Sequence, residues 1–571
     1  MSERKTAFWI LAAVSMLVIL PFLSETIFYS KGEPREAIVA YTMLESGNWI
    51  LPLNYGTDMA YKPPFLYWAI AAFSAILPGG VTEFSSRLPS ALSFLAMLWV
   101  VFDFFSRRKN VRTAFLTGML LLTSFEVHRA AVACRLDMLQ VSLIVIALLQ
   151  LYRWDEKGCR TVPWLAVALM AAASLTKGPV GTLFPCLVIG IYQLVRGKHF
   201  RRAFFPLAGI GLLSLVPLVI WFWVAYQQGG ESFSALMMEE NTGRFFNKMS
   251  YDSHNNPLWY NFLTLILGWI PWTVVFLISL CYLPWKRLLR LPEADSWRVR
   301  IGRTWNRFRM QPPVQLLTWL TILIIFIFYC IPESKRSVYL LPIYPFMAVL
   351  MAEYLLMLVR KRVGVFRVSA VLFLSVSVLL TVVFLAVRWG LIPDSIMGNG
   401  RHAAENIAFL HALRDATLSV PQWLLVWLPV VAAGCTGWEL MKRKRCYTLL
   451  YSIVGMMITL FVALDGVYQP IVLAVKSDKH LAEQIREVAP HGVVYSYANM
   501  SFYGVNYYLK DEMRHFETEL PARGYVIVPA KLVDELQETF GHRYRFAVQF
   551  VTRQRSCDLR DKIYMYHFEE N

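Results

Sequence analysis

The sequence is short of charge and of paired cysteines for its length. Charged residues make up 17% of its 571 residues, whereas a soluble chain carries about a quarter. The eight cysteines are scattered, with no CxxC pair and no Cys/His ligand spacing, so neither a disulfide framework nor a zinc cluster is indicated. The sequence also has no internal repeat, which leaves an inverted-repeat transporter without support.

Hydrophobic residues, by contrast, are abundant. They make up 57% of the chain, and apolar runs near the length of a bilayer span recur to about residue 470. This pattern predicts an all-α polytopic membrane protein. The net charge of +17 is carried in short clusters between the runs, as in the cytoplasmic loops of membrane proteins. We therefore expect no nucleic-acid partner.

The apolar runs predict about thirteen spans, and the basic clusters orient them. Segment 64–79 is bounded by Pro-Pro and Pro-Gly-Gly, and we predict that it does not cross, because a crossing would turn every later basic cluster outward. The N-terminus is then cytoplasmic and begins with an uncleaved first span. The predicted spans are 6–28, 88–106, 112–127, 137–152, 162–176, 180–195, 204–226, 258–284, 314–332, 339–359, 366–388, 421–441 and 447–467.

The chain changes character after about residue 470. Short β-rich runs alternate there with polar stretches of helical pattern. We predict a membrane domain at 1–470, with a first outer loop at 29–87, and a small soluble α/β domain at 471–571. The strand-like runs are 493–497, 525–528, 546–551 and 563–567, and the helix-like stretches are 478–488 and 530–540.

The first outer loop gathers ionisable residues directly after the first span. Glu33, Arg35 and Glu36 come first, and an apolar stripe at helical spacing follows from Val39 and ends before Gly47. This pattern predicts a helix lying along the membrane surface.

The same loop ends on Asp58, Tyr61 and Lys62, immediately before two prolines. Anchoring at the interface explains these residues as well as a binding site does. Asp137 lies at the outer edge of a later span, with Glu126, His128, Arg129 and Arg135 nearby in the sequence. A solvated helix end is the ordinary explanation, but ionisable groups gathered at one membrane depth are candidates for a functional site.

Cationic side chains recur on the predicted outer face, against the positive-inside bias. Each of them alone is explained as a loop residue. Together they suit a lipid phosphate, which they would neutralise through charge-assisted hydrogen bonds, and a carboxylate among them suits a general base. The cations are Lys62, Lys177, Arg244, Lys335 and Arg336, with His254 and Tyr339 beside them in the sequence.

Several of these segments resemble a known family. GEPREA, SGNW and KPP in the first loop, RLPSAL at 87–92, RLD at 135–137, TKGPVG at 176–181 and YLLPIYP up to residue 345 resemble segments of the bacterial aminoarabinose transferases of lipid A and the protein O-mannosyltransferases. These are integral membrane glycosyltransferases of the GT-C fold. The resemblance runs from the first span through most of the membrane region and extends to the α/β tail.

The resemblance also implies roles for individual residues. The family opens its first loop with Asp-Glu, whose Asp is the catalytic carboxylate; here Gly32 stands at that place, so Glu33 is the candidate base and Glu36 the second choice. Tyr61 replaces a Glu that in the family helps to hold a divalent metal, which leaves Asp137 as the metal candidate and the need for a metal open. The candidates for the donor phosphate are Arg35, Lys62, Lys177, Arg244, Lys335 and Arg336, and those for the rest of the substrate are Glu36, Asp58, Tyr61, His254 and Tyr339.

The activity that the resemblance implies is inverting transfer of a sugar from a polyprenyl-phosphate donor to a lipid, such as lipid A, at the periplasmic face of a bacterial inner membrane. A protein or glycan acceptor is an alternative. A transporter, or a non-catalytic protein that binds lipid-linked sugar, belongs to a different class and stays open. Near absence of ionisable residues in the middle of most spans argues against a translocation path.

Overall fold

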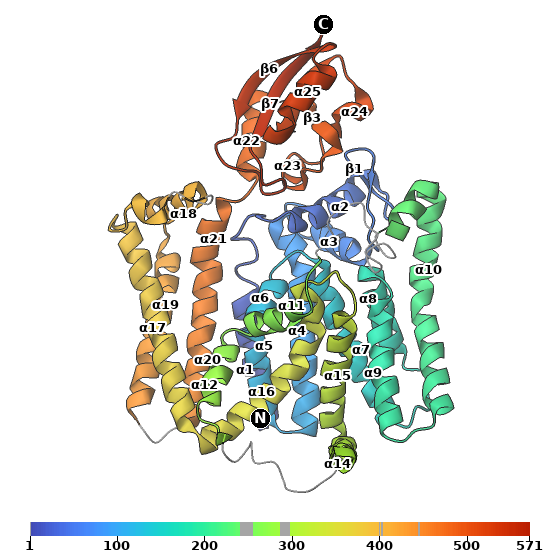
Figure 1. Cartoon of the computed structure of the whole chain (residues 1–571), viewed down its shortest axis with the longest axis vertical. Helices are drawn as coiled ribbons and strands as arrows, with labels where there is room; N and C mark the ends of the chain where they lie inside the picture. The colour runs from blue at the N-terminus through green and yellow to red at the C-terminus, as the bar shows by residue number, and fades with distance from the viewer. Residues whose placement is uncertain are drawn as a thin grey trace.

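The computed structural model describes residues 2–239, 255–285, 297–398, 400, 403–442, 446–490 and 492–571. Helices fill the chain up to Ala474, and a five-stranded sheet with short helices follows at the top of the molecule (Figure 1). The predicted fold class, an all-α polytopic membrane protein with a small C-terminal α/β region, is confirmed.

Each predicted span corresponds to a helix or a helix pair. By length and composition, eight helices of the described residues are fit to cross a membrane, or nine if one bent pair counts as a span. The helices at the predicted spans are α1 (Glu3–Ile19), α4 (Glu83–Arg108), α5 (Val111–Leu122), α7 (Leu136–Glu156), α8 (Trp164–Lys177), α9 (Val180–Val195), α10 (Phe200–Met238), α11 (Trp259–Gly268), α12 (Trp272–Leu280), α15 (Pro313–Cys330), α16 (Tyr344–Lys361), α17 (Val363–Arg388), α19 (Val420–Met441) and α20 (Cys446–Ala463).

Short elements join these helices. A π-helical turn, η4 (Leu464–Tyr468), continues α20 into α21. The 3-10 turn η2 (Ser337–Ile343) leads into α16. The other connecting elements are α6 (Phe125–Ala131), α14 (Trp297–Arg309), η3 (Asp394–Met397), α18 (Ala403–Asp415) and α21 (Gln469–Ala474).

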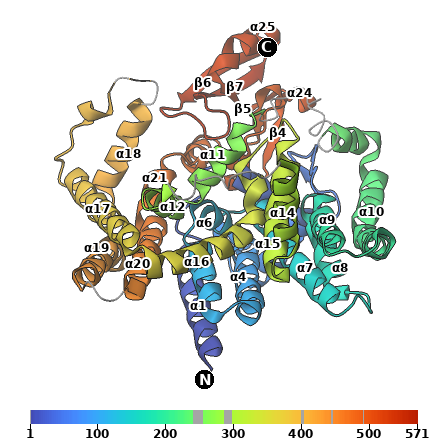
Figure 2. The same ribbon diagram turned by 60° about the horizontal axis from the view of Figure 1, so that its bottom comes forward.

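The predicted span 258–284 is broken, which corrects the expectation of one straight helix. Helices α11 and α12 meet at 105°, and both views draw them in different directions (Figures 1 and 2). Pro271 lies at the bend and has no N–H for a helical hydrogen bond. The carbonyl freed there is used by α6, because the Phe125 N–H donates to the Ile270 oxygen at 3.0 Å.

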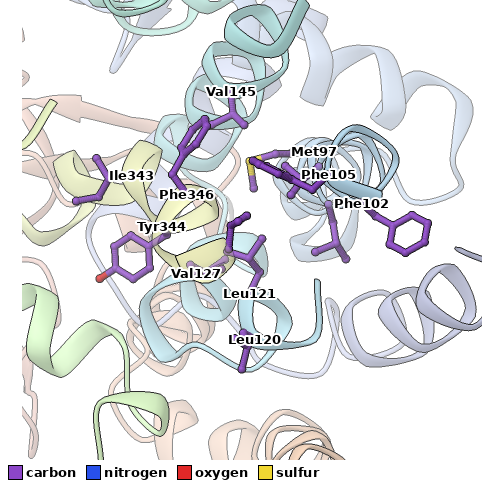
Figure 3. Close-up of a cluster of buried hydrophobic side chains, with 14 of the residues drawn as sticks. Met97, Phe102, Phe105, Leu120, Leu121, Val127, Val145, Ile343, Tyr344 and Phe346 are labelled. Atoms are coloured by element: carbon purple, nitrogen blue, oxygen red, sulfur yellow. The ribbon is translucent and has the colours of Figure 1, made fainter. Parts of the chain in front are cut away.

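The membrane helices share one continuous hydrophobic core. Helices α4, α5, α6, α7 and α16 contribute its large side chains, which interlock around Phe105, Leu121, Val127 and Phe346 (Figure 3). All four of these side chains are buried. In a membrane such a core is held together by close van der Waals packing between the helices, and it fixes the helices that carry the polar residues of the opposite end.

The basic clusters gather at the end of the bundle that holds the N-terminus. Arg4 pairs with Asp103, and Lys109 pairs with Glu353. Arg360 donates to the Tyr447 hydroxyl at 2.7 Å. Figure 1 places the N-terminus at the bottom and the C-terminal sheet at the top, so these clusters lie at the end away from the sheet.

The first loop folds into two helices and a hairpin at the end opposite to the N-terminus. Helix α2 (Gly32–Ser46) buries the predicted apolar stripe and ends at Gly47, whose φ of 69° is the left-handed cap that glycine favours. Helix α3 (Phe65–Ile76) has 12 residues, about 18 Å, which is too short for a hydrocarbon core of about 30 Å. The hairpin consists of β1 (Leu53–Asn54) and β2 (Asp58–Met59).

The C-terminal sheet has the strand order β4-β3-β5-β7-β6. Strand β3 pairs in parallel with β4 and β5, whereas β7 pairs antiparallel with β5 and β6. The predicted strand-like runs match β3 (Val494–Ser496), β5 (Arg523–Pro529), β6 (Tyr544–Val551) and β7 (Ile563–Glu570); β4 (Met513–His515) was missed. The helices and turns of this region are α22 (Lys479–Val488), η5 (Tyr497–Asn499), α23 (Tyr503–Tyr508), α24 (Phe516–Glu519), η6 (Ala530–Leu532) and α25 (Val533–Phe540).

Candidate active site

Glu33 lies in the first turn of α2 and is held by a buried guanidinium. Arg87 of α4 donates to both carboxylate oxygens, at 2.9 and 3.2 Å, and the Cys134 N–H donates a third hydrogen bond at 3.0 Å. Burial raises the pKa of Glu33, but Arg87 and Cys134 outweigh it and keep the pKa below its usual value. Both carboxylate oxygens of Glu33 are thus held by Arg87 and Cys134, and this geometry favours a structural role over contact with a substrate.

Glu36, one turn further along α2, faces a group of polar side chains. Arg35 donates to its Oε1 at 2.6 Å and Lys62 at 3.4 Å, while the Tyr67 hydroxyl donates to Oε2 at 2.8 Å. Burial raises the pKa of Glu36, but Lys62, Arg35 and Tyr67 lower it more strongly, to about 2. The carboxylate is therefore ionised and holds two cations in place.

Lys62 lies between the first loop and the helices behind it. Burial and the nearby Arg35 and Lys177 disfavour its positive charge, Glu36 and Asp137 favour it, and the result is a pKa of about 7. Its amine also lies 5.4 Å from the centre of the Tyr61 ring. A phosphate anion next to this amine would favour its protonated form and raise its pKa again.

Asp137 begins α7 and pairs with Lys177, the last residue of α8. The Lys177 amine lies 5.0 Å from the centre of the Tyr339 ring, in η2. Tyr339 in turn stacks on Tyr329 of α15, with 5.2 Å between the ring centres. Segments far apart in the sequence thus bring Arg35, Lys62 and Lys177 into one cationic group, balanced in part by Glu36 and Asp137.

Other predicted residues make their hydrogen bonds outside this group. The Lys335 amine donates to the Pro332 carbonyl at 2.6 Å and is buried, so its hydrogen bonds are local, and Arg336 is half-buried beside it. Asp58 accepts a hydrogen bond from His515 of β4 at 3.0 Å. Arg244 and His254 lie outside the described residues, and their roles stay predictions.

The residues present do not fit a family-type metal site. Asp137 is neutralised by the Lys177 amine, and Tyr61 offers a phenol where the family has a carboxylate. Within the described ranges, no group of three or more His, Cys, Asp or Glu side chains is placed to hold a metal ion. The reaction proposed below therefore contains no metal step.

Sequence reasoning missed Arg87 and Tyr67, and it named Arg135 only as a neighbour of Asp137. Arg87 stands in the quoted segment RLPSAL, but nothing in that segment indicates that it pairs with Glu33. The Arg135 guanidinium fills the space beside Gly32, because a Cβ built there would be 2.9 Å from its Nη2. The place of the family aspartate is thus taken by the side chain of an arginine from another helix.

The fold and the site define a polytopic membrane protein of the GT-C fold. The family model described as dolichyl-phosphate-mannose-protein mannosyltransferase matches residues 61–221. An uncharacterised protein of Aquifex aeolicus is 30% identical over 330 residues, which are 57% of this chain and 68% of that protein. The undecaprenyl phosphate-alpha-4-amino-4-deoxy-L-arabinose arabinosyl transferase 2 of Proteus mirabilis is 25% identical over 387 residues, 66% of this chain and 65% of that protein.

The solved structure of ArnT from Cupriavidus metallidurans bound to undecaprenyl phosphate has a TM-score of 0.69 and 20% identity, and the alignment covers 98% of this chain and 97% of that one. The chain belongs to the family of integral membrane glycosyltransferases of the GT-C fold, and within it is similar to the aminoarabinose transferases. The matched regions span about two thirds of the length of the curated relatives, 68% and 65%.

Proposed function

We propose that this protein transfers a sugar from a polyprenyl-phosphate donor to a lipid acceptor. One observation carries the proposal: Arg35, Lys62 and Lys177 converge at the end of the bundle that lies under the C-terminal sheet. These half-buried cations outnumber the two carboxylates beside them, Glu36 and Asp137, and a lipid phosphate would supply the missing negative charge. The relatives named above support a polyprenyl-phosphate as its source.

In the proposed reaction the acceptor oxygen attacks the anomeric carbon of the donor sugar. The bond between that carbon and the phosphate oxygen breaks, and the electron pair leaves with the lipid phosphate. Arg35, Lys62 and Lys177 stabilise the charge that grows on the leaving phosphate. Attack from the face opposite to the phosphate inverts the anomeric centre.

We assign the general base to Glu36 instead of Glu33. The donor phosphate competes for Arg35 and Lys62, and a carboxylate that loses these partners becomes more basic. Glu36 then accepts the proton of the acceptor hydroxyl. Glu33 would keep its partner when the donor binds, because Arg87 also donates to the Leu23 carbonyl at 2.7 Å and is held from both sides.

The proposed setting is a bacterial inner membrane. The basic clusters at the N-terminal end support a cytoplasmic N-terminus, and the opposite end, with the cationic group and the sheet, is then periplasmic. The membrane domain, 1–470, would hold the donor, and residues 471–571 would shape the entrance for the acceptor.

The test is a transfer assay on purified protein with radiolabelled polyprenyl-phosphate sugars and a total lipid and protein extract. Glu36→Gln is expected to abolish label transfer, whereas Glu33→Gln, if folded, is expected to retain most of it. Glu45→Gln, an exposed position in the last turn of the same helix, is the matched control. Full activity of Glu36→Gln would overturn the assignment of the base, and absence of transfer with every donor would overturn the function.

A protein acceptor is the second candidate, because the matching family model is described as a protein mannosyltransferase. The same assay separates the two. Label in the organic phase after extraction supports a lipid acceptor, and label in a protease-sensitive band supports a protein acceptor.

A further inference from the structure

The hairpin of the first loop contacts α10 through Met59, but its turn is anchored in the C-terminal region. Its turn is formed by Tyr55 and Gly56, with φ values of 54° and 78°. The left-handed conformation is rare for a bulky residue such as tyrosine and costs about 1–2 kcal/mol. It persists only where the surroundings fix it, so the contacts of Tyr55 explain why the turn keeps this shape.

Tyr55 is part of the hydrophobic core of the C-terminal region. Its side chain is 1% exposed and packs with residues of α22, α23 and the sheet. Its hydroxyl accepts a hydrogen bond from the Phe502 N–H at 2.7 Å, and its own N–H donates to Asp511 at 3.0 Å. A residue of the first loop thus completes a core that is otherwise built more than 400 residues later.

His515 closes the contact from the side of the sheet. Its ring stacks on Tyr55, with 4.6 Å between the centres and 12° between the planes. Its Nε2 lies 3.0 Å from an oxygen of Asp58, and its Nδ1 lies 3.0 Å from the Ser496 hydroxyl. His515 is 3% exposed, so both ring nitrogens are engaged and the ring orientation is fixed.

The hairpin leads directly to the cationic group. The Ala60 N–H donates to the Pro52 carbonyl at 3.3 Å and closes the hairpin, and Tyr61 and Lys62 follow. Pro63 and Pro64 then restrict the backbone up to the start of α3. Lys62 therefore lies on a short segment fixed at one end by β2 and at the other by a proline pair.

We propose that His515 is a positioning residue for sugar transfer, which acts through Tyr55 and Asp58 to hold Lys62 at the lipid phosphate. The inference rests on the proposed function for its reaction and on the hairpin contacts for its mechanism. Loss of the ring frees Asp58 and leaves the Tyr55 turn without its stacking partner. The hairpin then relaxes and Lys62 shifts away from the phosphate.

A double-mutant cycle tests this coupling, with undecaprenyl phosphate in nanodiscs as the binding probe. His515→Ala is expected to raise the Kd of the lipid phosphate about five- to tenfold, within the range of coupled residues. In a Lys62→Ala background the same change is expected to add less than twofold. His515→Gln, which keeps a side-chain N–H for Asp58, is expected to restore part of the affinity.

The control is His480→Ala, a histidine of the same region whose side chain is 66% exposed. It is expected to leave the Kd unchanged. Equal effects of His515→Ala with and without Lys62 would overturn the proposal, because a purely structural role is additive. If coupling in lipid binding is found but no sugar is transferred with any donor, the positioning role stands and the proposed reaction fails.

Discussion

The two ends of the helix bundle carry the same basic residue types in opposite settings. At the N-terminal end, Arg107 is 56% exposed and pairs with a partly exposed Asp103. At the opposite end, Arg87 and Glu33 form a pair in which both side chains are 3% exposed, and Glu36 is 2% exposed beside Arg35 and Lys62. Exposed basic residues, as in the first setting, are typical of cytoplasmic loops. In the second setting, burial makes the energy of each charge depend on its partner.

The largest expected difference between the two ends is in activity. Lys62→Ala removes a cation from the leaving phosphate, and loss of one such group typically costs about 100- to 1000-fold in rate. Lys361→Ala, at an exposed position of the N-terminal end, is expected to stay within about twofold, since exposed charges contribute little. Transfer rates at saturating acceptor measure the loss in both variants. Equal losses would contradict the difference in role that is drawn here between the two ends.

The second difference is in stability. Arg87→Ala leaves the buried Glu33 carboxylate without its partner, which typically costs about 3–5 kcal/mol. Arg107→Ala, the exposed counterpart, is expected to cost less than about 1 kcal/mol. Thermal unfolding in detergent gives the comparison, and a melting temperature of Arg87→Ala close to that of the wild type would contradict the structural role given to this pair.

A smaller effect concerns pH. Because the pKa of Lys62 is lowered to about 7, lipid-phosphate affinity is expected to fall as pH rises from 6 to 8, when the amine loses the proton that pairs with phosphate. Lys62→Arg keeps its charge throughout this range and is expected to flatten the profile. Binding curves of both proteins across pH decide the matter, and an unchanged slope in the arginine variant would assign the titration to another group.

The smallest effect is expected at Asp558, in the C-terminal region. Burial and the neighbouring Asp478 raise the pKa of its carboxyl, so the folded region holds a proton that the unfolded chain releases. A raised carboxyl pKa stabilises the fold most at low pH, and this stability is lost as pH rises towards neutrality. Protease resistance of residues 471–571 is expected to fall over that range, and Asp558→Asn to make it independent of pH.

Much of the fold could be predicted because the signals of a membrane helix lie within its own sequence segment. Apolar length and flanking charge depend on neighbours in the sequence, and every predicted span corresponds to a helix or a helix pair. The break between α11 and α12 was missed because a proline alone does not indicate one: α4, α9 and α19 continue through Pro89, Pro185 and Pro429.

The site could be predicted only in its residue types. Arg35, Glu36, Lys62, Asp137 and Lys177 were candidates, and the structure brings them together. How firmly each carboxylate is held could not be predicted, because that depends on partners from other helices. Glu33 and Arg87 are 54 positions apart, and no pattern around either residue indicates the pair.

The insertion of Tyr55 into a core formed late in the chain bears on how the protein is made. Asp58 and His515 are 457 positions apart. At a synthesis rate of about 5–20 residues per second, the first loop waits roughly half a minute or more for the strand that fixes it. Until those strands are made, the hairpin that leads to Lys62 lacks its contacts with the C-terminal region, so the proposed transfer activity is expected to appear only after the last strands dock.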